Sequence, residues 1–281
     1  MTSWWRVARI VLGGLTMLFA FTAIYVAAFH APRARGLDIG MVGTAAQAAQ
    51  LQSALDERDR VLLAQAQGLA PTETVSDALR KATHGSASVE DLRPLPTGDR
   101  RGLSSLFTVI GTLIPSLVFG VLLSVFGRAL APRVRWTAVL AYAVLAGVVV
   151  AVNVDVLVGA FDGDFLGIAA VIALLALAVS AAAHGLGHLS GERGIVLAIL
   201  LLMLLGVSSA GGAVTYQLEP GFYGAISQLL PPGAALTAVR NVEYFDWAAT
   251  LGPLLVLSAW AVGGVTLGLL GERYGPATRP S

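Results

Sequence analysis

The chain has 281 residues, of which 56% are hydrophobic and only 12% are charged, and its mean hydropathy is +0.75. A soluble globular domain carries about 25% charged residues, so this composition indicates a membrane protein. The net charge of +1 gives no support for nucleic-acid binding. The absence of cysteine excludes disulfides, iron–sulfur clusters and thiol catalysis.

The first apolar run extends from Val7 to His30 and follows the basic residues Arg6 and Arg9. A cleaved signal peptide is one interpretation of this pattern. Because the apolar part of a signal peptide is only about 7–15 residues long, an uncleaved membrane anchor is favoured. The basic flank then places the N-terminus in the cytoplasm, so residues 1–30 are predicted to hold a cytoplasmic N-terminal segment and the first transmembrane helix.

Residues 31–103 form the longest polar segment, and we expect a small α/β lobe outside the cytoplasm. A short strand is predicted at 37–43, helices at 45–67 and 74–83, and an extended return at 92–99. A unit of about 70 residues has only a small core. The lobe is therefore expected to lean on the membrane part or on a partner.

Five further apolar stretches follow, each long enough to cross a hydrocarbon layer of about 30 Å. Pro115 predicts a kink in the first of them. The sequence thus predicts an all-α membrane fold of six transmembrane helices, with the small α/β lobe between helices 1 and 2. Residues 104–281 hold the five-helix membrane domain, with spans at 104–126, 136–160, 166–189, 195–215 and 251–270.

The segment between the last two spans is rich in Gly, Pro and aromatic residues. Two breaks, at Glu219–Gly221 and at Pro231–Gly233, divide it. Aromatic rings beside short amphipathic segments are typical of the membrane–water boundary. Residues 216–247 are therefore predicted to form an outer amphipathic cap.

Basic residues give an independent estimate of orientation, because short cytoplasmic loops are enriched in arginine. With six spans, the predicted cytoplasmic segments hold nearly all the arginines of the short loops and ends. Both termini are therefore predicted to be cytoplasmic in a multi-pass protein of the plasma (inner) membrane. The arginines concerned are Arg6, Arg9, Arg128, Arg133, Arg135, Arg193, Arg273 and Arg279.

Three stretches resemble the type-2 ATP-binding-cassette exporter permeases, and among them the YhgE/phage-infection-protein-like group. They are YVAAFHAPRARGLDIGMVG at 25–43, DLRPLPTGDRRGLSSLF at 91–107, and the segment from SSAGG at 208 to NVEYF at 245. The resemblance covers nearly the whole chain, although the lobe at 31–103 is short for that group. It implies a permease subunit that exports amphiphilic or hydrophobic substrates as a homodimer, with energy from a separate ATPase.

The chain's own residues agree with a separate ATPase, because it contains no G-x-x-x-x-G-K-[ST] loop and its sole lysine is Lys81. No acid, base and nucleophile set appears, so no enzyme activity and no cofactor are predicted. A docking surface for the ATPase would include Arg128, Arg133 and Arg135. Plain anchoring at the cytoplasmic face is the competing interpretation, and it is favoured.

Four polar residues in or near the spans are candidates for contact with substrate or lipid. Asn153 and Asp155 lie late in the predicted third span, where an acid is a functional candidate or is simply solvated at the boundary. Arg240 and Glu243 are three residues apart in the cap. They either pair with each other or contact an anionic head group.

His184, His188 and Glu192 lie at i, i+4 and i+8, so one continuous helix would place them on one face. Two histidines one turn apart can chelate a metal ion. An interfacial helix end is the favoured alternative, and no metal site is predicted. Glycines in the spans, such as Gly111, Gly120, Gly147, Gly263, Gly264 and Gly268, are expected to serve helix packing.

A different class of function competes with the permease. The spans offer little buried polarity to line a path, which favours a membrane scaffold that transports nothing. In that case the lobe at 31–103 would bind a partner.

Overall fold

The fold is given by a computed structural model. It describes residues 102–211 and 226–274, together with the shorter stretches 5, 8–9, 11–16, 18–19, 22, 60–63, 88–91, 95–99 and 222. The strand predicted at 37–43 and the helix predicted at 74–83 lie outside these residues.

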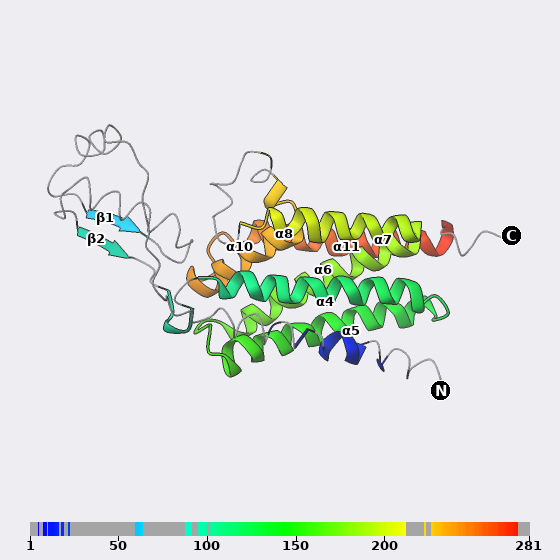
Figure 1. The fold of residues 1–281 in the computed structure, drawn as a ribbon, viewed down its shortest axis with the longest axis horizontal. Helices are drawn as coiled ribbons and strands as arrows, with labels where there is room; N and C mark the ends of the chain where they lie inside the picture. The colour runs from blue at the N-terminus through cyan, green and yellow to red at the C-terminus, as the bar shows by residue number, and fades with distance from the viewer. Residues whose placement is uncertain are drawn as a thin grey trace, which may run out of the picture.

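Four helices are long and apolar enough to cross a membrane (Figure 1). They are α4 (Ser104–Phe126), α5 (Pro132–Ala151) continued by the π-helix η3 (Val152–Leu157), α6 (Phe165–Ser190) and α11 (Leu251–Tyr274). At 1.5 Å per residue, 23 to 26 residues exceed the hydrocarbon thickness of about 30 Å. The chain is a membrane protein, and four of the predicted spans are confirmed.

The other two predicted spans are not among these four. Around the fifth, α7 (Glu192–Ala198), the π-helix η4 (Ile199–Leu205) and α8 (Gly206–Ser208) follow one another without a break. This run is shorter than the ~20 residues of a typical span, and residues 212–215 lie outside the described part. In the first span, the described residues between Trp5 and Thr22 are helical.

Local chemistry determines where the spanning helices begin and end. Pro132 is the first residue of α5, a position where its missing N–H is not needed. Asp164 caps α6, its side chain accepting from the Gly167 amide at 2.9 Å. At the far end, Gly191 adopts φ 62°, which separates α6 from α7.

Helix α6 is the centre of the bundle and contacts α4, α5, α7, α10 and α11. Small residues make this close approach possible. A Cβ on Gly120 would lie 2.8 Å from that of Ala183, and one on Gly264 would meet the backbone of Ala181 and Ala182. The predicted packing role of the span glycines is confirmed for these two and for Gly111, Gly147 and Gly268. It is wrong for Gly263, where an added Cβ would meet nothing within 4 Å.

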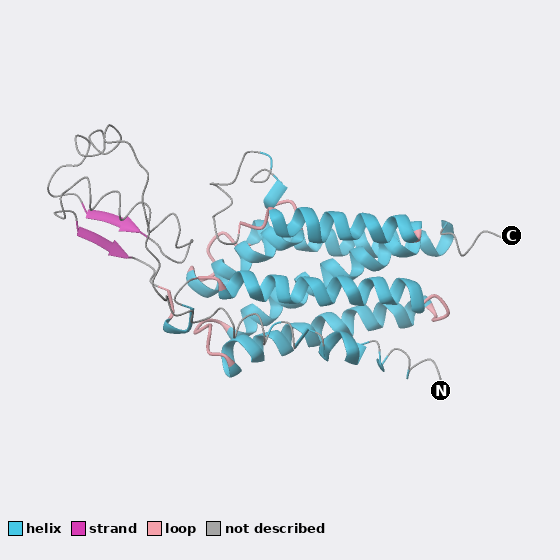
Figure 2. Ribbon diagram, viewed as in Figure 1, coloured by secondary structure: helices cyan, strands magenta, loops and turns pink. Residues whose placement is uncertain are grey.

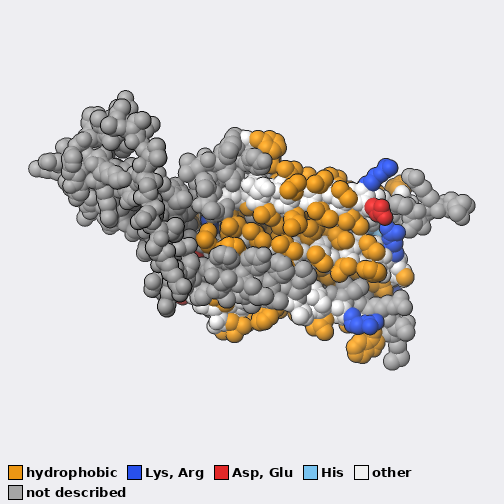
Figure 3. Space-filling view, viewed as in Figure 1, with side chains coloured by type: hydrophobic (Ala, Val, Ile, Leu, Met, Phe, Trp, Pro, Cys, Tyr) orange, Lys and Arg blue, Asp and Glu red, His pale blue; other side chains and the backbone are white. Residues whose placement is uncertain are grey.

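The outward faces of the bundle are apolar. Leu140 and Val144 on α5, and Leu255 and Val262 on α11, are each more than half exposed. Figure 3 shows hydrophobic side chains over the bundle, with charged side chains gathered at the end opposite the strands. This distribution suits helices that face lipid.

Two short strands, β1 (Arg60–Leu63) and β2 (Ser88–Asp91), pair in parallel with Arg60 opposite Ser88 (Figure 2). The prediction that the helix at 45–67 includes residues 60–63 is therefore wrong. The apolar run of Val61, Leu62 and Leu63 suits a strand as well as a helix. The α/β character of the lobe falls mostly on residues outside the described part.

Helix α10 (Pro231–Tyr244) packs against α6, α11, α4 and α8. Pro231 and Pro232 start this helix, since proline suits the first turn. Leu236, Val239 and Arg240 are all buried. The predicted cap therefore holds a helix set into the bundle.

Candidate functional site in the α10 network

The bundle has two chemically distinct ends. At the capped end α4, α6 and α11 begin and α10 lies between them, and at the arginine end α4 and α6 finish and α5 begins (Figure 1). Side chains at the capped end join α10 to three other chain segments. We call Asp99, Asp162, Asp164, Glu243, Tyr244 and Trp247 the α10 network.

The first contact of the network joins α10 to the entry of α4. The Tyr244 hydroxyl donates to Asp99 Oδ2 at 3.1 Å, and both side chains are buried. Asp99 Oδ1 accepts from the amides of Leu103 at 3.1 Å and Ser104 at 3.2 Å. One carboxylate therefore serves the free amides at the start of α4 and anchors α10.

Burial changes the pKa values of both side chains at this contact. It raises the pKa of the Asp99 carboxyl above its ordinary value, although the hydrogen bonds oppose the rise. Burial likewise raises the pKa of the Tyr244 hydroxyl, and the neighbouring Asp99 adds to the effect. The phenol therefore stays protonated and acts as a donor.

The second contact joins α10 to the loop between η3 and α6. Glu243 Oε1 accepts from the Asp162 amide at 2.9 Å. Its Oε2 is buried with no hydrogen-bond partner among the described residues. Burial raises the pKa of Glu243 to about 7, and the Asp155, Asp162 and Asp99 charges act in the same direction. This carboxyl therefore titrates near neutral pH.

The third contact joins the turn after α10 to the start of α6. Trp247 Nε1 donates to Asp164 Oδ2 at 3.1 Å. This bond and the bond from the Gly167 amide lower the pKa of Asp164. Asp164 is therefore ionised at neutral pH and stabilises the positive end of α6.

The turn after α10 is strained. Asp246, Trp247 and Ala249 have φ values of 47°, 66° and 55°, in the left-handed region that residues other than glycine rarely adopt. Such conformations cost on the order of 1–3 kcal/mol each and cluster at functional sites and switch regions. Here the strained turn lies directly beside the contact between Trp247 and Asp164.

Arg240 and Glu243 have separate hydrogen-bond partners. Arg240 Nη1 donates to the Gly211 carbonyl at 3.4 Å, whereas Glu243 bonds to the Asp162 amide. Burial lowers the pKa of Arg240, and the Tyr244 and Asp99 charges oppose this shift. Arg240 is buried inside the capped end, so its predicted contact with a lipid head group has no support in its position.

Asn153 and Asp155 both lie in η3 but have different surroundings. Asn153 is buried and its Nδ2 donates to the Phe19 carbonyl at 3.3 Å and to Thr22 Oγ1 at 3.4 Å. It therefore fixes the N-terminal helical segment to the bundle. Asp155 is half-exposed near the end of η3, as the boundary interpretation expects.

The arginine end holds a buried ion pair. Arg135 Nη2 bonds to Glu272 Oε1 at 3.0 Å, and the arginine side chain is only 4% exposed. Its Nη1 also donates to the Leu130 carbonyl at 3.2 Å. Arg128 and Arg133 are exposed. Of the three arginines proposed for ATPase docking, Arg135 is therefore buried and bonded within the protein, whereas Arg128 and Arg133 are accessible to a partner.

The predicted row of His184, His188 and Glu192 does not form. Helix α6 ends at Ser190, and Glu192 begins α7 beyond the turn at Gly191. The two histidine rings stack with centroids 5.5 Å apart, and Trp136 meets His184 edge-on at 5.2 Å. Within the described part of the chain, no three His, Asp or Glu side chains gather as a metal site requires.

Five residues of the network were not singled out from the sequence as site residues, and one of them, Asp162, takes part only through its backbone amide. Asp164 had a recognisable signal, since an acid directly before a long apolar run is typical of a helix cap. Tyr244 and Trp247 were interpreted as boundary aromatics, which hides their polar contacts. Asp99 had no such signal, because it bonds to Tyr244 from 145 positions away.

These features define the class of the molecule as a helical membrane protein with at least four spans, one end of which is closed by a short buried helix. Comparison with known protein families, with curated proteins and with solved structures found no match.

Proposed function

We propose that this protein is the membrane permease subunit of an exporter for amphiphilic or hydrophobic molecules, energised by a separate ATPase. The proposal includes six spans, with both termini and the arginine end in the cytoplasm of a plasma-membrane protein. It also includes a homodimer. The resemblance to type-2 exporter permeases supports it.

One structural observation carries the proposal. Helix α10 is packed into the capped end against α4, α6, α8 and α11, and side-chain hydrogen bonds beside a strained turn tie it to the entry of α4 and to the segment before α6. Individual hydrogen bonds contribute only ~0.5–1.5 kcal/mol net, or ~1.5–3 kcal/mol to a charged group. Release of a substrate at that end would require these bonds and the apolar packing of α10 to open together while the spans stay in contact, and the strained turn marks the place where such a shift would begin.

The arginine end supports the ATPase part of the proposal. Arg128 is exposed on the short connection between α4 and α5, Arg133 is exposed in the first turn of α5, and Arg193 is exposed at the start of α7. Because Arg135 and Glu272 hold this connection to α11, a partner that binds Arg128 and Arg133 would act on a rigid point. A displacement of this end of α4 would then be transmitted along the helix to Asp99, which is bonded to the first amides of α4.

The test is purification of the tagged protein from the membranes of the cell that naturally makes it. We expect an ATPase to accompany it, together with ATP hydrolysis. Combined Arg128→Ala and Arg133→Ala substitution should remove both, while the matched Arg→Lys pair should keep them and both variants should unfold at the wild-type temperature. Absence of ATP hydrolysis from the wild-type preparation would contradict the proposal.

A membrane scaffold is the second candidate, and a specific observation favours it. The hydroxyls of Thr108, Thr112 and Ser116 are buried along α4 but donate to carbonyls of their own helix. In the described spans they therefore line no polar path. If the protein purifies alone and its deletion changes no efflux or resistance phenotype, the scaffold becomes the better account.

A further inference from the structure

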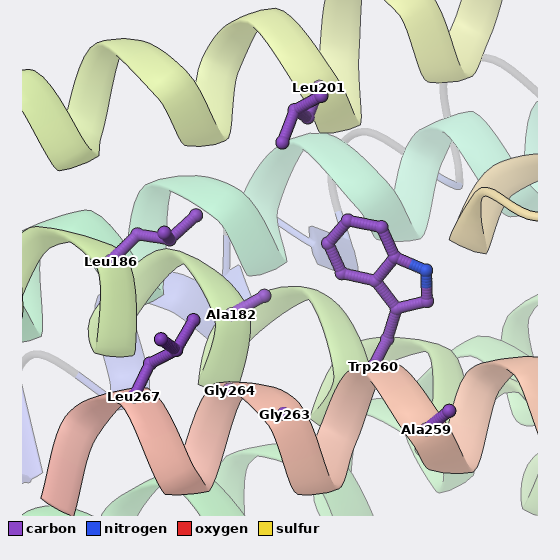
Figure 4. A pocket seen from close by; sticks show the side chains of 8 residues that line it. All are labelled: Ala182, Leu186, Leu201, Ala259, Trp260, Gly263, Gly264 and Leu267. Atoms are coloured by element: carbon purple, nitrogen blue, oxygen red, sulfur yellow. The ribbon is translucent and has the colours of Figure 1, made fainter. Parts of the chain in front are cut away.

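An apolar groove of about 370 Å³ opens on the side of the bundle between α6, η4 and α11 (Figure 4). Trp260 forms one wall and Leu201 from η4 lies across from it. The groove is lined by Ala182, Leu186, Leu201, Ala259, Trp260, Gly263, Gly264 and Leu267.

The groove lies at the middle depth of the membrane. Its lining residues on α11 run from Ala259 to Leu267 within a helix that spans Leu251–Tyr274. At 1.5 Å per residue they lie roughly 12–24 Å along a helix of roughly 36 Å. A hydrocarbon layer of about 30 Å therefore surrounds the opening, and acyl chains meet it directly.

The chemistry of the groove matches hydrocarbon and offers nothing to a polar ligand. Trp260 carries the one side-chain N–H among the lining residues, and that N–H already donates to the Leu229 carbonyl at 2.9 Å. Gly263 leaves the floor open, since a Cβ there would meet nothing within 4 Å. An empty groove of this kind would lose dispersion contacts on every wall.

Size decides between an acyl chain and a helix as the occupant. A cavity of about 150 Å³ in another protein takes up benzene, so 370 Å³ accommodates a longer stretch of hydrocarbon. A helix is about 10 Å across, so 12 Å of it would fill roughly 900 Å³. A single flexible chain can enter the groove along its length, whereas a helix of a second copy is too wide to enter and could contact only its open side.

We propose that this groove is a binding site for one acyl chain of a bilayer phospholipid. The chain lies between α11 and η4 against the face of Trp260, and its head group remains at the membrane surface. Its terminal methylenes fill the space that Gly263 leaves. The site is independent of the proposed transport function, because it requires only that η4 and the four described spans lie in a bilayer.

The test is fluorescence quenching of the detergent-solubilised full-length protein by a phosphatidylcholine with brominated acyl chains. We expect a saturable quenching component that is absent in Trp260→Phe. Gly263→Leu fills the groove and should weaken the apparent affinity at least tenfold. Gly252→Leu is the matched control, because Gly252 lies on the same helix, also has nothing within 4 Å and is outside the groove; it should bind as the wild type does.

Several outcomes would overturn the proposal. One is quenching that rises without saturation, and another is equal quenching of the Gly263→Leu and Gly252→Leu variants. A third is a dimer that Gly263→Leu disrupts although the brominated lipid never quenches Trp260, which would assign the groove to a second copy. If Gly263→Leu does not fold, Ala259→Leu at the exposed edge of the groove replaces it with the same expectation.

Discussion

Among single residues, Glu243 is the most sensitive part of the α10 network. Its pKa is raised from an ordinary 4.5 to about 7, so the folded state holds the proton more tightly than the unfolded state. The contribution of Glu243 to stability is therefore complete below pH ~4.5 and is lost as the pH rises to about 7, after which this group adds no further change.

Replacing Glu243 by Gln should reduce this pH dependence, because the amide keeps an oxygen for the Asp162 N–H and carries no charge. At pH 8 we expect the free energy of unfolding of the variant to be higher than that of the wild type by on the order of 1–2 kcal/mol. This value allows for the part of the side chain that faces solvent. Thermal unfolding in detergent from pH 5 to 8 measures it. Glu192→Gln, at an exposed site of the arginine end, is the control, and identical pH profiles for the Glu243→Gln variant and the wild type would contradict the expectation.

Two arginines only two positions apart provide a second contrast between residues. Arg135→Ala would leave the loop carbonyls and the partly exposed Glu272 without the buried donor that they share, so we expect a loss of about 1–3 kcal/mol. Arg133→Ala removes an exposed side chain and should change stability by no more than about 0.5 kcal/mol. Unfolding temperatures of the two variants compare them directly, and similar losses would refute the buried ion pair.

Among the elements, the close contact between α6 and α11 depends on glycines, and Gly264 is one of them. A Cβ on Gly264 would meet the backbone of Ala181 and Ala182, whereas one on its neighbour Gly263 meets nothing within 4 Å. Gly264→Ala should therefore force the helices apart at a cost of about 1–3 kcal/mol. Gly263→Ala should be neutral or slightly stabilising, because alanine favours the helix. Thermal unfolding of this matched pair tests the packing, and an equal effect would contradict it.

The spanning helices were predictable from the sequence because long apolar runs have few alternatives in a membrane. Positions such as Ser104 and Phe126 were predicted to the residue as the ends of a span. Helix α10 was not predicted, since Pro231–Gly233 looks like a break although proline also suits a first turn. Residues 60–63 were assigned to a helix because a short apolar run does not distinguish helix from strand.

The site was less predictable than the spans for a physical reason. Glu243 and Arg240 were recognised as polar residues in an apolar setting, but their partners lie in other elements. The bonds from Tyr244 to Asp99 and from Trp247 to Asp164 join residues 145 and 83 positions apart. Spacing along one chain reports neighbours on the same helix, so contacts of this kind appear only once the bundle is assembled.

For the whole molecule, the account requires the two ends of the bundle to lie on opposite sides of the membrane. The four described spans and the burial of α10 between α4, α6 and α11 place Ala248 at the capped end and Ala129 at the arginine end. Both residues are exposed. The absence of native cysteine allows a single reporter thiol at either position.

The most direct measurement is labelling of Ala129→Cys and Ala248→Cys in intact cells with a thiol reagent that cannot cross the membrane. We expect the reagent to modify residue 248 from outside and to modify residue 129 only after the membrane is opened. Labelling of both positions from the same side would contradict a bundle that crosses the membrane with α10 at its outer end, and the permease proposal would fail with it.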